Sequence, residues 1–173
     1  IITRHRREKH SIVRGAFVAD VRRDILKIAV INRYEPRAPV AVGFIRGFGL
    51  KAGAIASSVA HDSHNIVAVG VDDASLCAAV NLVIKARGGI SVVGREKRAV
   101  LPLPIAGLMS DRPAAEVAEA AQGIVRAMQD CGCQLNNAYM QHSLLALVVI
   151  PELRISDLGI VDVTRFELVD LLV

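Results

Sequence analysis

Aromatic side chains are scarce in this chain of 173 residues, which has no Trp, two Tyr and four Phe. Proteins that bind single-stranded nucleic acids stack bases on aromatic rings, and this sequence offers almost none. Charged residues make up only 22% and hydrophobic residues 53%, a balance that excludes a disordered chain. The chain suits one domain with a core of Val, Ile, Leu and Ala, and it is too short for a (β/α)₈ barrel of about 250 residues.

Cysteines and long apolar runs are also few. Cys77, Cys131 and Cys133 form no even disulfide framework, so we expect a reducing cytoplasm. The C-x-C pair could ligate a metal, but no second pair lies nearby, so we interpret it as plain thiols at a helix end. No apolar run reaches the roughly 20 residues that cross a bilayer, and no signal peptide is predicted, so we expect no membrane contact. The chain starts with Ile rather than Met, which indicates an excerpt, a cleavage product or a truncated relative.

Positive charge is concentrated at the start of the chain. Residues 1–37 contain ten Lys or Arg and four Asp or Glu, whereas the remaining 136 contain eleven and thirteen. The basic run over residues 4–10 has no recognisable nucleic-acid-binding module behind it. We therefore interpret residues 1–14 as a solvated basic segment or linker, and we expect no nucleic-acid partner.

Short β-branched runs succeed one another through most of the chain. Their bounds predict strands over 16–21, 25–31, 40–45, 52–59 and 65–70, and a hairpin over 90–93 and 99–101. So many short strands in succession are typical of an α+β fold. We predict a single, largely antiparallel or mixed β-sheet of about six to eight strands with two main helices packed on it.

Apolar residues recur with helical spacing in two segments, 73–87 and 112–131. Each segment is preceded by side chains that can cap a helix, namely Asp72 or Asp73 for the first and Ser110 or Asp111 for the second. We predict that both helices pack on one face of the sheet. The apolar run over 144–150 is either a buried strand or a short helix, because periodicity does not distinguish them.

The densest group of polar side chains lies between two of the predicted apolar strands and comprises His61, Asp62, Ser63, His64 and Asn65. Histidine titrates near neutral pH, and a nearby carboxylate can fix its tautomer. Loops at strand ends often carry functional groups. Alternatively, the segment is a polar turn whose Asp, Ser and Asn side chains satisfy backbone donors. The spacing alone leaves both interpretations open.

Other chemistries have weaker signals. His61 and His64 are weak candidates for metal ligands, because H-x-x-H lacks the glutamate of the zinc helix and no third ligand is evident. No G-x-S-x-G elbow is present, so a serine hydrolase is not expected. The glycines over 43–49 match neither a phosphate-binding loop nor a dinucleotide motif, so no cofactor-binding residue is predicted.

Several segments together resemble one family. The stretch from Gly43 to Asn65, which ends in Ser57-Ser58-Val59-Ala60-His61-Asp62-Ser63-His64-Asn65, is similar to the C-terminal domain of adenine deaminases, in the amidohydrolase superfamily. So are residues 101–111 (LPLPIAGLMSD), residues 149–163 and the segment 24–34. The resemblance runs in order through residues 15–173, which we take as the domain.

Adenine deaminases hydrolyse adenine to hypoxanthine and ammonia. The resemblance implies a cytoplasmic, homo-oligomeric enzyme of purine salvage that uses a divalent metal, Mn²⁺, held in a barrel domain. The barrel's His-x-His and further ligands have no counterpart in this chain, so the isolated chain is predicted to be inactive. The expected partners are adenine and the barrel. His61, Asp62 and His64, with Ser63 and Asn65, are expected on a loop that faces the barrel mouth and helps to close the active site.

The sequence departs from the family at Gln141 and His142, where small or hydroxyl residues are more usual. Two alternatives stay open. The chain could be a non-enzymatic, stand-alone structural or interaction domain. It could also be a small metal-binding protein that uses His61 and His64.

Overall fold

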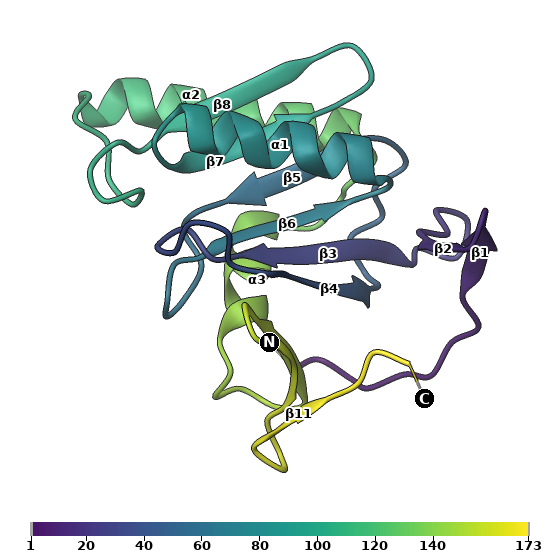
Figure 1. Cartoon of the computed structure of the whole chain (residues 1–173). Coiled ribbons are helices and arrows are strands. Elements are labelled where there is room, and N and C mark those ends of the chain that lie inside the picture. The colour runs from purple at the N-terminus through teal and green to yellow at the C-terminus, as the bar shows by residue number, and fades with distance from the viewer. Residues whose placement is uncertain (1, 173) are drawn as a thin grey trace.

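A computed structural model describes residues 2–172 and has a six-stranded sheet at its centre (Figure 1). The strands of this sheet are β3 (Leu26–Ile31), β4 (Val40–Ile45), β5 (Ala54–Ser57), β6 (Ile66–Gly70), β7 (Gly89–Val93) and β8 (Arg98–Pro102). Their order across the sheet is β4-β3-β6-β5-β7-β8, and every neighbouring pair is antiparallel. The predicted α+β class is confirmed, with a main sheet that is antiparallel throughout.

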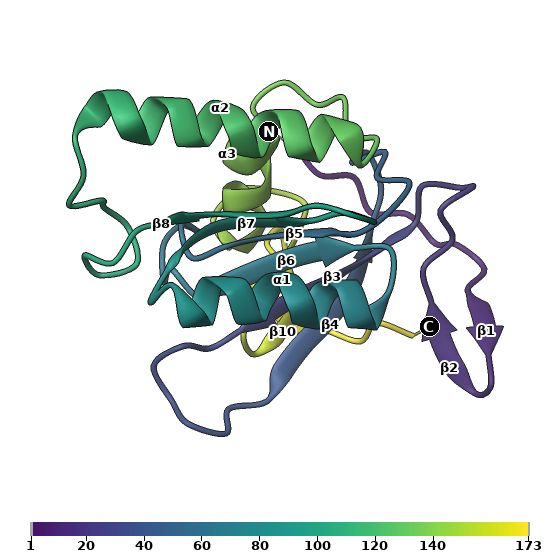
Figure 2. The ribbon, with the colours of Figure 1, turned by 90° about the horizontal axis from the view of Figure 1, so that it is seen from above.

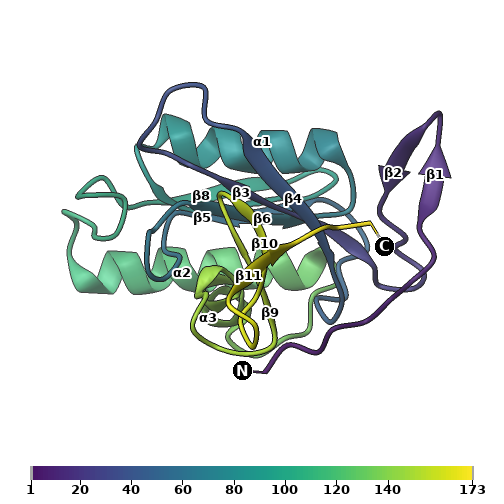
Figure 3. The same ribbon diagram turned by 60° about the horizontal axis from the view of Figure 1, so that its bottom comes forward.

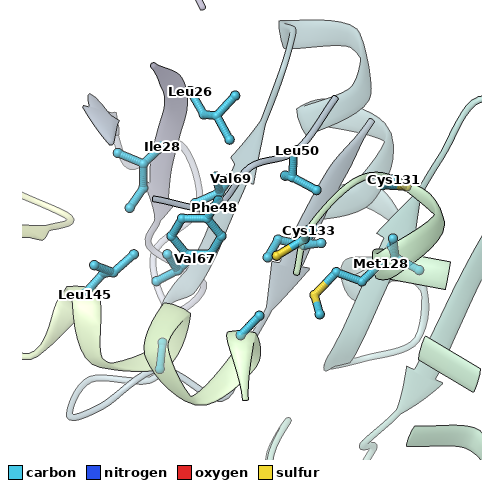
Figure 4. Packing of buried hydrophobic residues seen from close by; sticks show 14 of the residues in the cluster. Leu26, Ile28, Phe48, Leu50, Val67, Val69, Met128, Cys131, Cys133 and Leu145 are labelled. Atoms are coloured by element: carbon cyan, nitrogen blue, oxygen red, sulfur yellow. The ribbon is translucent and has the colours of Figure 1, made fainter. Parts of the chain in front are cut away.

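The two main helices, α1 (Asp73–Lys85) and α2 (Ala114–Asp130), lie on opposite faces of this sheet (Figure 2). The prediction that both pack on one face is therefore wrong. All five residues of β6 are buried, because alternate side chains enter a core on each side. On the α1 side, Ala68 packs with Leu76 and Val83 in one cluster. On the α2 side, a larger cluster surrounds Val67 and Val69, as Figure 4 shows for its central residues.

The helix ends differ in how they are capped. The Asp72 carboxylate caps α1, because it accepts a hydrogen bond from the Ser75 amide at 2.7 Å. For α2 the capping prediction is wrong: Pro113 occupies the N-cap position and no side chain caps the helix. Ser110 Oγ accepts instead from the Arg112 amide at 3.1 Å, within the loop before the helix. The C-x-C pair lies where predicted, because Cys131 is the C-cap residue of α2.

The remaining elements flank this framework (Figure 3). They are the hairpin β1 (Ser11–Val13) and β2 (Ala16–Val18), helix α3 (Ala138–Ser143), the 3₁₀ helix η1 (Leu144–Ala146), and a three-stranded sheet of β9 (Leu153–Ser156), β10 (Gly159–Asp162) and β11 (Glu167–Val169). The run over 144–150 thus begins as a 3₁₀ helix and contains no strand. No helix in residues 2–172 is both long and apolar enough to cross a membrane.

The first residues are joined to β9 rather than frayed. Thr3 Oγ1 donates to the Leu153 carbonyl at 2.6 Å, and the Glu152 amide donates to the Thr3 carbonyl at 3.1 Å. Arg154 Nη1 donates to Thr3 Oγ1 at 2.7 Å, and the His5 amide donates to Glu152 Oε2 at 3.0 Å. These hydrogen bonds hold residues 3–5 although the neighbouring arginines are exposed.

Candidate functional site

The polar residues 61–65 form the loop between β5 and β6. Three loops meet at this end of the main sheet, because Ile31 pairs with Ile66 and Gly89 pairs with Pro102. These are the loop after β3, the β5–β6 loop and the loop after β8. Within the β5–β6 loop, Asn65 is buried, His61 and His64 are partly buried, and Asp62 and Ser63 are exposed.

The turn brings the two predicted imidazoles together. The ring centroids of His61 and His64 are 5.4 Å apart and their planes are inclined by 57°. The His64 amide donates to the Ala60 carbonyl at 2.7 Å, and Nδ1 of His64 accepts from the Ala60 amide at 3.3 Å. An accepting Nδ1 places the proton of the neutral ring on Nε2. The backbone of Ala60 therefore sets the tautomer of His64.

The surroundings of His64 favour its neutral form. Burial lowers the pKa of His64, and the neighbouring His61 and Arg33 lower it further, against the opposing charge of Asp62. Because histidine normally titrates near 6.5, the His64 ring is neutral at pH 7 and can donate a hydrogen bond through Nε2–H.

The other two predicted residues play unequal parts. Asp62 acts on His64 through its charge, since no hydrogen bond joins it to either imidazole in the described part of the chain. His61 Nδ1 is buried and has no hydrogen-bond partner there. Buried polar atoms in native proteins are nearly always paired, so this nitrogen marks a place where a further group could bind.

Two residues not singled out as functional in the sequence, Arg33 and Tyr34, contact this loop from the end of β3. Arg33 Nε donates to the His64 carbonyl at 2.6 Å, and Tyr34 Oη donates to the Ser63 carbonyl at 2.7 Å. Asn65 Nδ2 donates to Ser63 Oγ at 3.3 Å, and Asn65 Oδ1 accepts from the Arg33 amide at 3.4 Å. The sequence signal for Arg33 and Tyr34 is their place in the family-like segment 24–34.

The loop after β8 is joined to the same end through buried Ser58. Its hydroxyl donates to the Gly107 carbonyl at 2.6 Å and accepts from the Gly89 amide at 2.8 Å. A Cβ on Gly88 would lie 2.2 Å from the Gly107 Cα, so the two backbones can approach this closely only without a side chain. The family-like stretch 101–111 is therefore held at Gly107 against Ser58, at the start of the β5–β6 loop, and against Gly88.

Metal-ligating side chains do not gather here in sufficient number. No group of three or more His, Cys, Asp or Glu residues able to hold a metal ion occurs in residues 2–172. Structural and catalytic metal sites usually take at least three protein ligands, so His61 and His64 alone do not supply a complete set. Burial raises the pKa of Cys131 and of Cys133, which favours the neutral thiol over the thiolate. Residues 2–172 therefore offer no complete ligand set for a divalent metal.

The arrangement can orient a small molecule or a water. Within the β5–β6 loop it offers one neutral imidazole N–H, one imidazole nitrogen without a partner among the described residues, and an exposed carboxylate. These groups can donate, accept and hold a hydrogen bond in a set direction.

Comparisons with known proteins agree with the resemblance. A sequence-family model described as "Adenine deaminase C-terminal domain" matches residues 1–167. The adenine deaminase of Paracoccus denitrificans is 66% identical over 148 residues, which is 84% of this chain and 25% of that protein. That of Archaeoglobus fulgidus is 54% identical over 152 residues, which is 88% of this chain and 27% of the relative. That of Moorella thermoacetica is 46% identical over 171 residues, which is 98% of this chain and 29% of the relative.

The chain thus spans about a quarter of the length of the curated relatives that it matches. The family model includes the basic residues 1–14 as well as the rest of the domain. With a match over nearly the whole chain, this protein belongs to the adenine deaminase C-terminal domain family.

Proposed function

We propose that this chain serves as the C-terminal domain of an adenine deaminase and that its His61–Asn65 loop helps to close the active site. The reaction adds water at C6 of adenine and releases ammonia, which gives hypoxanthine. A divalent metal, Mn²⁺ by resemblance, would supply the hydroxide from a barrel domain, because residues 2–172 contain no ligand set for it.

One observation carries the proposal. The family-like segments 24–34, 43–65 and 101–111 meet at this end of the main sheet. Hydrogen bonds from the side chains of Arg33 and Ser58 hold them together. A polar turn with only a structural role would need its own hydrogen bonds satisfied. Among the residues that the structure describes, the buried His61 Nδ1 has no hydrogen-bond partner, and the His64 ring is hydrogen-bonded through Nδ1, which leaves Nε2–H to donate elsewhere. Hydrogen-bonding atoms left available on a loop that is held in place favour a role in binding a ligand over a purely structural turn.

The part proposed for each side chain is one of positioning. His64 would donate a hydrogen bond from Nε2 to the substrate or to a water beside it, and His61 Nδ1 would accept a hydrogen bond from the same partner. Asp62 would tune the charge around His64 from the exposed side of the loop. Hydrogen-bonding groups that orient reacting atoms typically change activity by about 10–100-fold when they are removed.

The test uses a chimera in which this chain replaces the matching quarter of the Paracoccus denitrificans adenine deaminase. His61→Ala and His64→Ala should each lower turnover by about 10–100-fold with little change in melting temperature. His5→Ala, at an exposed histidine outside this loop, is the matched control and should leave both unchanged. Unchanged turnover in both loop variants would refute the active-site role.

The proposal also concerns the chain by itself. We expect the 173 residues alone, with or without added Mn²⁺, to form no hypoxanthine from adenine above background, because no described group of residues can hold the metal. Metal-dependent deamination by the isolated chain would show that the chemistry does not require a barrel.

A further inference from the structure

Arg33 joins two of the loops at the candidate site. Its Nε donates to the His64 carbonyl at 2.6 Å and its Nη2 donates to the Ala106 carbonyl at 2.7 Å. The first carbonyl belongs to the β5–β6 loop and the second to the loop after β8. Both acceptors are backbone atoms, so the guanidinium sets the separation of two main-chain segments, 42 residues apart in the chain, rather than of two side chains.

The guanidinium is itself held from several sides. The Tyr34 ring centroid lies 4.9 Å from Cζ of Arg33, and Nη2 also donates to Tyr34 Oη at 3.2 Å. The Arg33 amide donates to Asn65 Oδ1 at 3.4 Å, so main chain and side chain of Arg33 both contact the same loop. A Cβ on Gly107 would lie 2.5 Å from Nη1, so the loop after β8 fits closely around the guanidinium only with glycine there.

These contacts are more specific than the fold requires. Ser58 already fixes Gly107 to Gly89 through buried hydrogen bonds, and the strands beneath are fully paired. Arg33 itself is only partly buried. Lysine would supply the same charge but not the planar fork, whose donors point in fixed directions. The Arg33 hydrogen bonds therefore fix the relative position of the two loops more than they stabilise the core.

We propose that Arg33 is a positioning residue for the deamination proposed above, on which this inference rests. Its guanidinium holds the His61–Asn65 loop against the loop after β8, so that His61 and His64 point in one set direction. Arg33 acts through the two backbone carbonyls and does not itself touch the reacting atoms. Its loss would leave the imidazoles present but loosely directed, which lowers the rate of the chemical step more than the affinity for substrate.

The test compares three variants in the same Paracoccus denitrificans chimera. Arg33→Gln removes both clamping bonds and should lower kcat by about 10–100-fold, with KM changed far less and the melting temperature little altered. Arg33→Lys keeps one donor and should recover part of that loss. Arg22→Gln removes an exposed arginine elsewhere on the domain and should match the unmodified chimera.

A second measurement reads the loops directly. Hydrogen exchange of the amides over 60–65 and 105–108 should be faster in Arg33→Gln than in the chimera, while exchange in β3 and β6 stays the same. Unchanged kcat in Arg33→Gln, or a loss that rises with KM and is not eased by lysine, would overturn the positioning role. If His64→Ala lowers turnover while Arg33→Gln does not, this inference alone fails. If neither variant lowers turnover, the proposed function fails with it.

Discussion

The two faces of the main sheet are built from side chains of different size. Under α1, the buried cluster is rich in alanine, with Ala54, Ala56, Ala68 and Ala79 among its members. Under α2 and α3, the cluster contains large side chains such as Phe48, Leu50 and Met128, seen in Figure 4. Small residues let a helix lie close to the strands, whereas large ones require a thicker layer. We call the alanine-rich α1 side the thin core and the α2 side, with its larger side chains, the thick core.

The thick core also encloses the polar rings of Tyr139 and His142, whereas the α1 side buries Ser91, whose hydroxyl donates to the Ala79 carbonyl at 2.8 Å. Tyr139 donates from Oη to the Ser91 carbonyl at 2.9 Å, and burial raises its pKa. His142 is fully buried, with ring centroids 6.2 Å from Phe48 and 6.3 Å from Tyr139. Neither nitrogen of His142 has a hydrogen-bond partner in residues 2–172. A thick layer offers room for such groups, at a cost in stability.

The largest effect should come from removing bulk on the α2 face. Leu50→Ala deletes a fully buried side chain from the large cluster and should lower the free energy of unfolding by about 2–5 kcal/mol. Urea unfolding followed by circular dichroism measures this. Ile84→Ala, at a residue 53% exposed on α1, is the control and should change stability by about 0.5 kcal/mol or less. Equal losses in the free energy of unfolding for Leu50→Ala and Ile84→Ala would contradict the difference in burial between the two residues.

His142 should make the α2 face sensitive to acid. Burial lowers the pKa of His142 to about 3, whereas the unfolded chain titrates near 6.5. Below 6.5 the unfolded state therefore takes up a proton that the folded state does not, and stability falls until the pH nears 3. The slope is about 1.4 kcal/mol per pH unit, or about 2 kcal/mol between pH 6.5 and 5.

His142→Leu should remove that part of the acid dependence while leaving the contribution of His64 in place. The measurement is the free energy of unfolding from pH 7 to 4 in both proteins. Parallel curves for the two proteins would show that His142 takes up its proton in the folded state.

The α1 face should resist added bulk. Ala68→Leu places extra methylenes between β6 and α1, where Ala68 is fully buried, and should cost about 1–3 kcal/mol. The melting temperature of this variant, compared with that of the conservative Val67→Ile on the opposite face, measures the difference. If Ala68→Leu is neutral, α1 can move away from the sheet and the thin core is not tightly packed.

Capping should distinguish the two helices by a smaller amount. Asp72→Ala removes the side-chain bond to the Ser75 amide and should cost about 1 kcal/mol. Asp111→Ala, before the uncapped α2, should fall within about 0.5 kcal/mol of the parent chain. Thermal unfolding of the two variants side by side tests this, and a larger loss from Asp111→Ala would contradict the capping seen here.

The last test labels the thiols of the native protein and needs no substitution. Cys77 is exposed on α1, whereas Cys131 and Cys133 are buried and burial raises the pKa of each. A thiol-labelling reagent should therefore modify Cys77 first, and the other two only on unfolding. Labelling of all three at one rate in the native protein would show that the α2 face opens readily.

Much of the sheet could be predicted from the sequence because β-branched runs with turn residues between them leave few alternatives. The strands β3, β4, β7 and β8 lie within about a residue of the predicted bounds, and Asp72 caps α1 as one of two predicted candidates. The α+β class follows from this succession. Which face of the sheet each helix covers could not be predicted, because every residue of β6 is apolar or small and its sequence marks neither face as exposed.

The candidate site was predicted in part. The group His61 to Asn65 stands out because polar, titratable side chains interrupt two apolar strands. Arg33 gives no such signal, since its partners are the backbone carbonyls of His64 and Ala106 and no side-chain pattern records them. The lack of an N-cap on α2 is hidden for a similar reason: Ser110 and Asp111 are suitable residue types, but Pro113 starts the helix after both. Whether the loop acts in catalysis stays a prediction.

The bonds between Thr3 and β9 have a mechanical consequence. Residues 3 and 153 are joined by Thr3 Oγ1 and the Leu153 carbonyl, although 150 positions separate them in the sequence. Tension applied ahead of Ile2 would reach β9 and Arg154 before it reached the β1–β2 hairpin. Any domain attached upstream would therefore transmit its movements to the three-stranded sheet, and from there to β4, against which β9 and β10 pack. The six-stranded sheet would feel such a pull at its β4 edge, at the opposite side from β8.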